Sequence, residues 1–319
     1  MKHLSVLVFV VAVVTCNYAV FAYDDSDVCP PPDQIAPCTC FRAPLTKRIT
    51  ALCTNFTNAM DIQDIFDRNP GWNLQDVHID RSAMQYLPAQ MLEKARFQSL
   101  NLSSSVLHTM FDVTPVKTPE LNLYLHDVKL SRGFQWSDIA NSTLRELTIF
   151  GLVIRHFGQK FIDNIPKTVK ALWFENSNTA SISPRAFANL SELEVLSVIR
   201  GSLKTISRDM FPKPTRMMFL DFSYHRISKL PEDIFSDMPH LGVFRFEGNR
   251  IKTMSEKVFI KSNALYGLIG NPIVCNCDIK WITTGKVTLQ LVKGECVEPN
   301  ALKGRKLETL KPSDFSYCQ

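Results

Sequence analysis

The chain has 319 residues, of which 45% are hydrophobic and 21% charged, with 12 Gly and 18 Pro, so collagen-like and disordered chains are excluded. Its net charge of +5 is too small to indicate a nucleic-acid partner. The first predicted element is an export signal at residues 1–22. Lys2 and His3 precede an apolar run from Leu4 to Val14, and Val20-Phe21-Ala22 offers small residues for cleavage. The mature chain is expected to begin at Tyr23.

A membrane anchor is the alternative to a cleaved signal. The apolar run at Leu4–Val14 is shorter than the about 20 residues that span a bilayer. No later stretch is long enough, and the chain ends at Cys318-Gln319 without the hydrophobic tail of a lipid-anchor signal. We therefore expect a secreted, extracellular protein with no membrane span.

The cysteines agree with an oxidising compartment. Cys16 lies in the predicted signal, and the other eight form two clusters, Cys29, Cys38, Cys40, Cys53 and Cys275, Cys277, Cys296, Cys318. Pairing within each cluster leaves nine possible patterns. Four cysteines can also hold zinc, but C-x-C spacing in an exported chain without a nearby histidine favours disulfides, so no metal is expected.

The middle of the chain repeats. The pattern L-x-x-L-x-L-x-x-N-x-L fits Leu241, Phe244, Phe246, Asn249 and Ile251, and it recurs toward the N-terminus at intervals of 23 to 25 residues. The apolar fourth position of the repeat falls at Val77, Leu100, Leu123, Leu147, Leu172, Leu196, Leu220 and Phe244. Such intervals are typical of leucine-rich repeats, in which each coil contributes one short strand and buries its apolar face against its neighbours.

The sequence therefore predicts an α/β fold, a right-handed leucine-rich-repeat solenoid with a curved parallel sheet. Further apolar pairs such as Ile182 with Phe187, Leu230 with Phe235 and Met254 with Phe259 are expected to pack its convex side. The predicted segments are a cysteine cap at 23–73, eight repeats at 74–262, and a last strand with a second cysteine cap at 263–319.

Both clusters resemble the cysteine caps of extracellular leucine-rich-repeat proteins. Cys29-x8-Cys38-x-Cys40-x12-Cys53 is similar to the N-terminal cap, and Cys275-x-Cys277-x18-Cys296-x21-Cys318 to the C-terminal one, in which Trp281 matches a usual aromatic residue. The resemblance implies crossed disulfides, Cys29–Cys40, Cys38–Cys53, Cys275–Cys296 and Cys277–Cys318.

The ninth repeat position departs from the superfamily. It is usually Asn, which hydrogen-bonds the turn backbone, but only Asn249 and Asn271 keep it, and the earlier coils have Ser82, Ser105, Val128, Leu152, Ser177, Gly201 and His225. The asparagine ladder is therefore predicted to be mostly missing. In this degeneracy, in its size and in its Cys-Pro-Pro-Pro start, the chain is similar to secreted arthropod proteins that resemble the non-catalytic subunit of deep-sea shrimp luciferase. The resemblance implies a secreted binding or stabilising protein.

A candidate partner site follows from the repeat register. Positions 5 and 7 of each strand are expected to face outward on the concave side, because side chains alternate along a strand. Large apolar side chains gather at the central strands, and we expect an exposed partner-binding strip. The candidate residues are Tyr124, His126, Phe150, Trp173, Glu175, Ile199, Asp221 and Arg245 at positions 5 and 7, with Phe219 at position 3 and Tyr224 at position 8 beside them. Alternatively, glycans or the N-terminal segment cover the strip, or its aromatic side chains only stack on one another.

Four sequons at Asn55, Asn101, Asn141 and Asn189 predict glycosylation. Asn101 occupies position 5 of the second strand, where a glycan would direct a protein partner toward the central and C-terminal strands. The other three fall in the cap or in loops.

Catalysis has little support. The usual nucleophile, zinc and nucleotide-binding motifs are absent from the sequence, so no catalytic residue and no cofactor is assigned. His126, Asp127 and Glu175 are the nearest acid–base candidates, but an exposed polar rim explains them better. Lys303, Arg305, Lys306 and Lys311 invite a heparin-like interpretation, although Glu308 and Asp314 are interleaved and favour a solvated cap surface.

Two functions remain. The first is a non-enzymatic binding protein that recognises or stabilises an extracellular protein partner through its concave face. The second is a structural or matrix protein that self-associates. The oligomeric state does not follow from the sequence.

Overall fold

The computed structural model describes residues 29–68, 72, 74–94, 97–116, 120–259, 264–285 and 288–318. The predicted signal peptide and the expected mature start at Tyr23 lie outside these residues. Within them, no helix is both long and apolar enough to cross a membrane.

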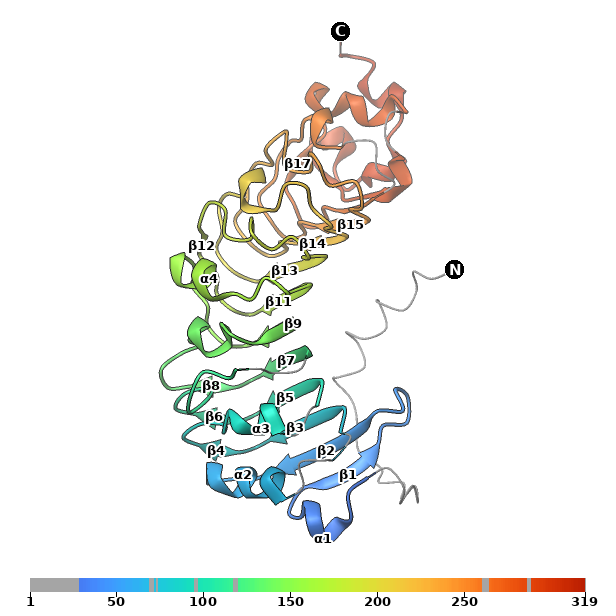
Figure 1. Ribbon diagram of the computed structural model, residues 1–319. Coiled ribbons are helices and arrows are strands. Elements are labelled where there is room, and N and C mark those ends of the chain that lie inside the picture. Colours follow the sequence, from blue (N-terminus) through green and yellow to red (C-terminus); the bar gives the residue numbers. More distant parts are fainter. Residues whose placement is uncertain are drawn as a thin grey trace.

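A twelve-stranded sheet runs the length of the molecule (Figure 1). At the N-terminal end, β1 (Thr39–Arg42) pairs antiparallel with β2 (Ile49–Thr54), and all later neighbours are parallel. The following strands are β3 (Asp76–Asp80), β5 (Ser99–Ser103), β7 (Glu120–His126), β9 (Thr143–Phe150), β11 (Ala171–Glu175), β13 (Val195–Ile199), β14 (Phe219–Asp221), β15 (Val243–Arg245), β16 (Leu265–Gly267) and β18 (Val292–Lys293).

The predicted register is confirmed. The eight apolar fourth positions, from Val77 to Phe244, are direct partners on successive strands. Phe244 then pairs with Tyr266 of β16, and β2 precedes the first predicted strand by pairing with β3. The alternation of buried and outward residues fixes this register, because a one-residue slip would turn every apolar side chain to solvent.

Shorter elements complete each coil on the other sides. Three small sheets are β4 (Ala83–Met84) with β6 (Val106–Leu107) and β8 (Lys129–Leu130), β10 (His156–Phe157) with β12 (Ser181–Ile182), and β17 (Ile273–Val274) with β19 (Cys296–Glu298). The α-helices are α1 (Pro32–Ile35), α2 (Ala59–Arg68), α3 (Gln90–Lys94) and α4 (Gln159–Asn164). The 3-10 helices are η1 (Trp136–Ile139), η2 (Arg208–Met210), η3 (Glu256–Val258), η4 (Cys277–Thr283), η5 (Leu289–Leu291), η6 (Asn300–Leu302), η7 (Leu307–Thr309) and η8 (Pro312–Phe315).

Phenylalanine side chains form much of the core between the sheet and the convex side. The ring centroids of Phe157 and Phe174 are 4.8 Å apart, and those of Phe161 and Phe187 are 5.5 Å apart. All four are fully buried. The predicted convex-side pairs Ile182–Phe187, Leu230–Phe235 and Met254–Phe259 are buried too. Because each coil contributes to a shared core, its stability depends on its neighbours.

All four disulfides implied by the cap resemblance are present. Cys29–Cys40 and Cys38–Cys53 close the N-terminal end, and Cys275–Cys296 and Cys277–Cys318 close the C-terminal end. Trp281 is buried beside Phe259, with 4.9 Å between the rings. The last repeats therefore pack directly on the second cap.

The ladder at the ninth position is more complete than predicted. Asn249 accepts a hydrogen bond from the Ile227 N–H at 3.0 Å and donates one to the Phe222 carbonyl at 2.8 Å. His225 makes the equivalent two bonds one coil earlier, from the Leu203 N–H to Nδ1 at 3.2 Å and between Nε2 and the Val198 carbonyl at 2.9 Å.

Serines replace the ladder asparagine near the N-terminus. The Ser82 and Ser105 hydroxyls accept hydrogen bonds from the N–H groups of Phe56 and Ser82, both at 3.0 Å. The expectation of a mostly missing ladder was wrong at these positions and at His225, because hydroxyl and imidazole groups there accept the turn N–H in place of a carboxamide.

Candidate binding face

The outward positions of β7 to β15 lie side by side on the face of the sheet that lines the inner curve of the solenoid (Figure 1). Tyr124, Phe150, Trp173, Ile199 and Phe219 are each partly exposed there. Tyr224, just beyond β14, is 49% exposed. The predicted aromatic residues therefore reach the surface, but their contacts divide them into separate groups.

The first group lies on β7 and β9. The rings of His126 and Phe150 stack with centroids 4.6 Å apart. The Tyr124 hydroxyl donates a hydrogen bond to the Glu146 carboxylate at 3.0 Å. Burial, followed by the negative charge of Glu146, raises the pKa of Tyr124, and burial raises the pKa of Glu146. Tyr124 is thus a neutral side chain held in place by its neighbour.

The second group spans β11 to β15. Trp173 reaches across β13 to Phe219, with 5.4 Å between the rings, and the Arg245 guanidinium lies over the same Phe219 ring at 5.7 Å. Register places Ser197 and Asp221 between Trp173 and Arg245. The two long side chains converge above these short ones, which are only 1% and 3% exposed.

The expectation that Asp221 faces a partner therefore needs correction. Its side chain is buried, and its carboxylate accepts a hydrogen bond from the Ser223 N–H at 2.9 Å. Burial raises the pKa of Asp221. Ser223, another predicted outward residue, is also buried. Alternation along a strand predicts which way a side chain points, but it does not predict whether neighbouring side chains cover it.

A third group lies where β11, β13 and β14 end. Glu175 forms an ion pair with Arg200, and the Arg200 guanidinium lies over the Tyr224 ring at 5.3 Å. Arg200 was missed by the sequence analysis, as was Glu146. Arg200 follows its strand at the position where every coil from β2 to β16 has a left-handed backbone. A large side chain at that position was the signal in the sequence that could have identified it.

The acid–base candidates do not form a catalytic arrangement. His126 Nδ1 lies 3.3 Å from the Asp127 carboxylate. Phe150 stands between His126 and Glu175 in the register, and Glu175 is paired with Arg200. In the described part of the chain, no group of three or more His, Cys, Asp or Glu side chains could hold a metal ion.

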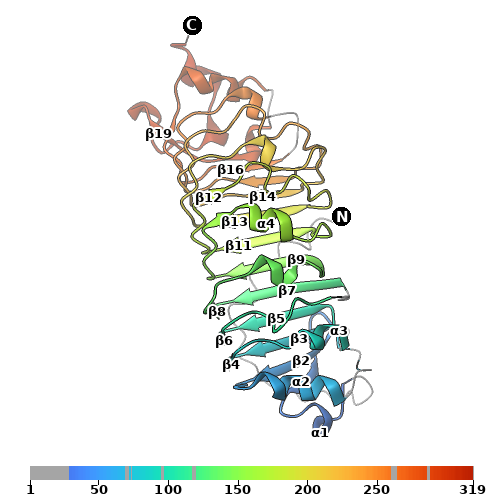
Figure 2. The same ribbon diagram turned by 60° about the vertical axis from the view of Figure 1, so that its left-hand side comes forward.

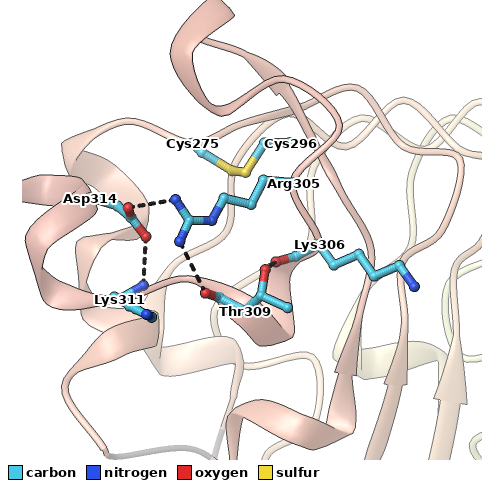
Figure 3. The surroundings of a disulfide bond; sticks show 7 residues. All are labelled: Cys275, Cys296, Arg305, Lys306, Thr309, Lys311 and Asp314. Carbon is cyan, nitrogen blue, oxygen red and sulfur yellow. Dashed lines mark hydrogen bonds and ion pairs between the residues drawn. A yellow bond between two sulfur atoms is a disulfide. The ribbon is translucent and has the colours of Figure 1, made fainter.

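The cations of the C-terminal cap are partly neutralised (Figure 3). Arg305 forms an ion pair with Asp314 at 2.7 Å, and Lys293 pairs with Glu308 at 3.3 Å. Figure 3 shows the Lys306 side chain directed away from the Arg305–Asp314 pair. The pairing agrees with a solvated cap surface, as the interleaved charges predicted.

We predict sugar on all four sequons when the chain is expressed through a secretory pathway. Asn55, Asn141 and Asn189 are exposed, and Asn101 is half-buried on β5, in register with His78 and Tyr124. Enzymatic glycan removal in ¹⁸O-water followed by peptide mass spectrometry locates each site. An unmodified Asn101 would contradict the prediction and leave the N-terminal half of the concave face open.

No protein-family model matches the chain. The chain is 20% identical over 360 residues to the Oplophorus-luciferin 2-monooxygenase non-catalytic subunit of Oplophorus gracilirostris, covering 99% of this chain and 98% of that protein. It is 22% identical over 242 residues to Toll-like receptor 9 of Mus musculus, covering 73% of this chain but only 22% of the receptor.

Solved structures share the fold. A chain of the octameric complex of Latrophilin 3, Unc5D and FLRT2, in which FLRT2 is the leucine-rich-repeat component, matches with a TM-score of 0.56 and 16% identity, covering 82% of this chain and 88% of that one. Human 5T4, the trophoblast glycoprotein, matches with a TM-score of 0.55 and 18% identity, covering 91% of this chain and 99% of that one. The protein is a leucine-rich-repeat solenoid with a cysteine cap at each end, similar over nearly its whole length to that non-catalytic subunit.

Proposed function

We propose that the protein is a secreted, non-enzymatic binding protein that holds an extracellular protein partner on its concave face. The observation that carries this proposal is the group of Trp173, Phe219 and Arg245, which are partly exposed and mutually packed on the inner face of the sheet. Folding alone does not require large apolar side chains there. Trp, Tyr and Arg are also the residue types most enriched at the energetic centres of protein interfaces.

The comparisons support a non-catalytic role. The relative that matches along its full length is a non-catalytic subunit, and four disulfides suit an extracellular compartment. Phe150, Tyr224 and Ile199 extend the apolar surface on either side of the central group. Glu175 is restrained by Arg200, so its charge is fixed in direction and is suited to orienting a partner.

The test replaces Trp173 by Ala. We expect partner binding to weaken by about 2 kcal/mol or more, because a rigid aromatic contact is lost from the centre of the interface. Folding should be nearly unchanged, since truncating an outward side chain leaves no core cavity. By contrast, Leu172→Ala is expected to cost about 2–5 kcal/mol of stability, because Leu172 is fully buried on the same strand.

Partners are captured from the source fluid on the immobilised mature chain, purified, and titrated against each variant, with thermal melting on the same samples. Val153→Ala is the matched control, because Val153 is 50% exposed but lies beyond the end of β9. If Trp173→Ala binds like the control, the concave face is not the interface. If the mass instead rises with concentration in the absence of any other protein, the chain is a self-associating structural protein.

A further inference from the structure

The side of the solenoid where the strands end carries positively charged side chains without acidic ones among them. Five segments follow β9, β11, β13, β14 and β15 on this side, and we call them the carboxyl-end flank. They are residues 151–158, 176–183, 200–207, 224–231 and 248–255. These five segments contain no Asp or Glu. Their cationic residues are Arg155, Arg200, Lys204, Arg226, Lys229, Arg250 and Lys252. The flank segments thus carry a formal charge of +7, more than the net charge of +5 of the whole chain.

The coil geometry keeps these cations on the surface. Leu203, Ile227 and Ile251 point inward and are buried. The residues beside them alternate outward, so Lys204, Arg226, Arg250 and Lys252 are exposed. Backbone hydrogen bonds join the coils, from the Arg226 N–H to the Leu203 carbonyl and from the Arg250 N–H to the Ile227 carbonyl, both at 2.8 Å. Lys204, Arg226 and Arg250 thus lie on three adjacent coils about 4.8 Å apart, and Lys252 shares the last of these coils with Arg250.

These four cations are not neutralised by carboxylates. None of them forms an ion pair within the described ranges, whereas acidic side chains elsewhere are paired, Glu192 with Arg216 and Glu232 with Lys257. Two other flank cations are engaged or partly compensated. Arg200 pairs with Glu175, and Lys229 is close enough to Glu232 to contribute to lowering the pKa of that carboxyl.

A hollow of about 450 Å³ lies within the same flank, next to β12. Lys204 and Arg226 line it together with Ser181, Ser202 and Thr205, of which Ser181 has its hydroxyl 2.6 Å from His156 Nδ1, and no acidic residue is among its lining residues. Cations beside hydroxyl donors are the groups that bind the oxygens of sulfate and phosphate esters. Figure 2 shows β8 and β12 along this side, and beyond β12 the described flank segments after β13, β14 and β15 form no strand.

We propose that the carboxyl-end flank binds a linear sulfated polysaccharide across the three coils that carry Lys204, Arg226, Arg250 and Lys252. Unpaired cations on adjacent coils suit a polyanion better than a single small anion. These four cations lie beyond the strand ends, outside the group of Trp173, Phe219 and Arg245, so one molecule can bind a protein partner and a sulfated chain together.

The flank favours a polysaccharide over the two other polyanions. Membrane-surface binding needs apolar side chains that enter the lipid, but the flank segments after β13 to β15 expose no large hydrophobic residue other than Tyr224. Single-stranded nucleic acid needs a free aromatic face for base stacking. The Arg200 guanidinium already lies over the Tyr224 ring at 5.3 Å, and Gly248 is close to the same ring, since a Cβ added to it would lie 2.5 Å away.

The test measures binding of the mature chain to immobilised heparin between 0.1 and 0.5 M salt. The variant Lys204→Ser/Arg226→Ser/Arg250→Ser is expected to lose at least about tenfold in affinity and to depend less steeply on salt, because fewer counterions are released. The matched control Lys160→Ser/Lys167→Ser/Lys170→Ser removes the same charge from exposed positions on α4 and before β11. It should bind as the unmodified chain does. Thermal melting verifies that both variants fold.

The outcomes decide the proposal. Equal losses in the two variants would show an effect of net charge only and overturn it, as would tighter binding to 20% phosphatidylserine vesicles or to single-stranded DNA than to heparin. The triple variant Lys204→Arg/Arg226→Lys/Arg250→Lys should retain most of the affinity, since it keeps every charge. Partner binding by Trp173→Ala is a separate readout, so failure of either proposal leaves the other standing.

Discussion

Lowering the pH from 7.5 to about 4 should destabilise the unmodified chain by about 3 kcal/mol more than the His225→Asn variant. In the folded chain, burial lowers the pKa of His225 to about 4, and the hydrogen bond to the Val198 carbonyl only partly opposes this. Nδ1 must accept the Leu203 N–H, so it has to remain unprotonated. The folded imidazole is therefore neutral throughout the window in which an unfolded histidine, with a pKa of about 6.5, takes up a proton.

The direction of this pH effect on stability follows from proton binding by the two states. Above pH 6.5 His225 is neutral in both the folded and the unfolded chain, so its full contribution to the free energy of unfolding is present. Between about 6.5 and 4 the unfolded chain binds more protons than the folded one, so stability falls by about 1.4 kcal/mol for each pH unit. Asp221, Glu146 and Asp138 have raised pKa values and act in the opposite direction, which is why the comparison is made with a variant that retains them.

Urea unfolding at pH 7.5, 6.0, 5.0 and 4.0 measures the difference. Asn at position 225 is expected to fold, because Asn249 makes the same two bonds one coil later. His225→Ala is expected to be less stable at every pH, since it leaves the Leu203 N–H and the Val198 carbonyl without their partner. Parallel stability curves for the unmodified chain and His225→Asn would show that His225 does not titrate in this window.

The second large effect is expected at Gly201, the ladder position that precedes His225. An alanine Cβ there would overlap the Thr179 carbonyl oxygen and lie 2.5 Å from Cε1 of His225. Thr179 is held by its bond from the Ser202 N–H at 2.8 Å, so it cannot withdraw freely. We expect Gly201→Ala to cost about 2–3 kcal/mol in the free energy of unfolding, the scale of an overpacked core.

Gly242→Ala is the matched control. Like Gly201, Gly242 does not adopt a left-handed backbone, but its added Cβ would meet only the Met218 carbonyl, at 3.7 Å. This control should change stability by less than about 0.5 kcal/mol. The double variant Gly201→Ala/His225→Asn removes the contact with the imidazole and keeps the one with Thr179, so partial recovery is expected. A Gly201→Ala variant as stable as the control would mean that the coils separate without cost.

Gly201 and His225 together form one adaptation of the ladder. An imidazole is larger than a carboxamide, and the ladder accommodates His225 because the preceding coil has no side chain at Gly201. In the sequence the two residues looked like independent losses of the ladder asparagine. Only the stacking of coils shows that one makes room for the other.

The repeat fold followed from the sequence because its determinants are local and periodic. The alternation at Leu172 and Phe174 fixes which side of a strand is buried, and recurrence at nearly constant spacing places each strand beside the next. The cap disulfides came from a resemblance, since spacing alone allowed nine pairings. The strands β2 and β18 were missed because no repeat pattern marks them.

The surface was decided by the tertiary structure. Trp173 and Arg245 converge on Phe219 from strands on opposite sides, and Asp221, which period-two alternation had placed in the open, is buried between their strands. The group of cations from Lys204 to Lys252 likewise appears only when coils are stacked, because residues about 24 positions apart in the chain become neighbours. Sequence periodicity thus determined the direction of each side chain, while the packing of adjacent coils decided which of them reach solvent and which lie together.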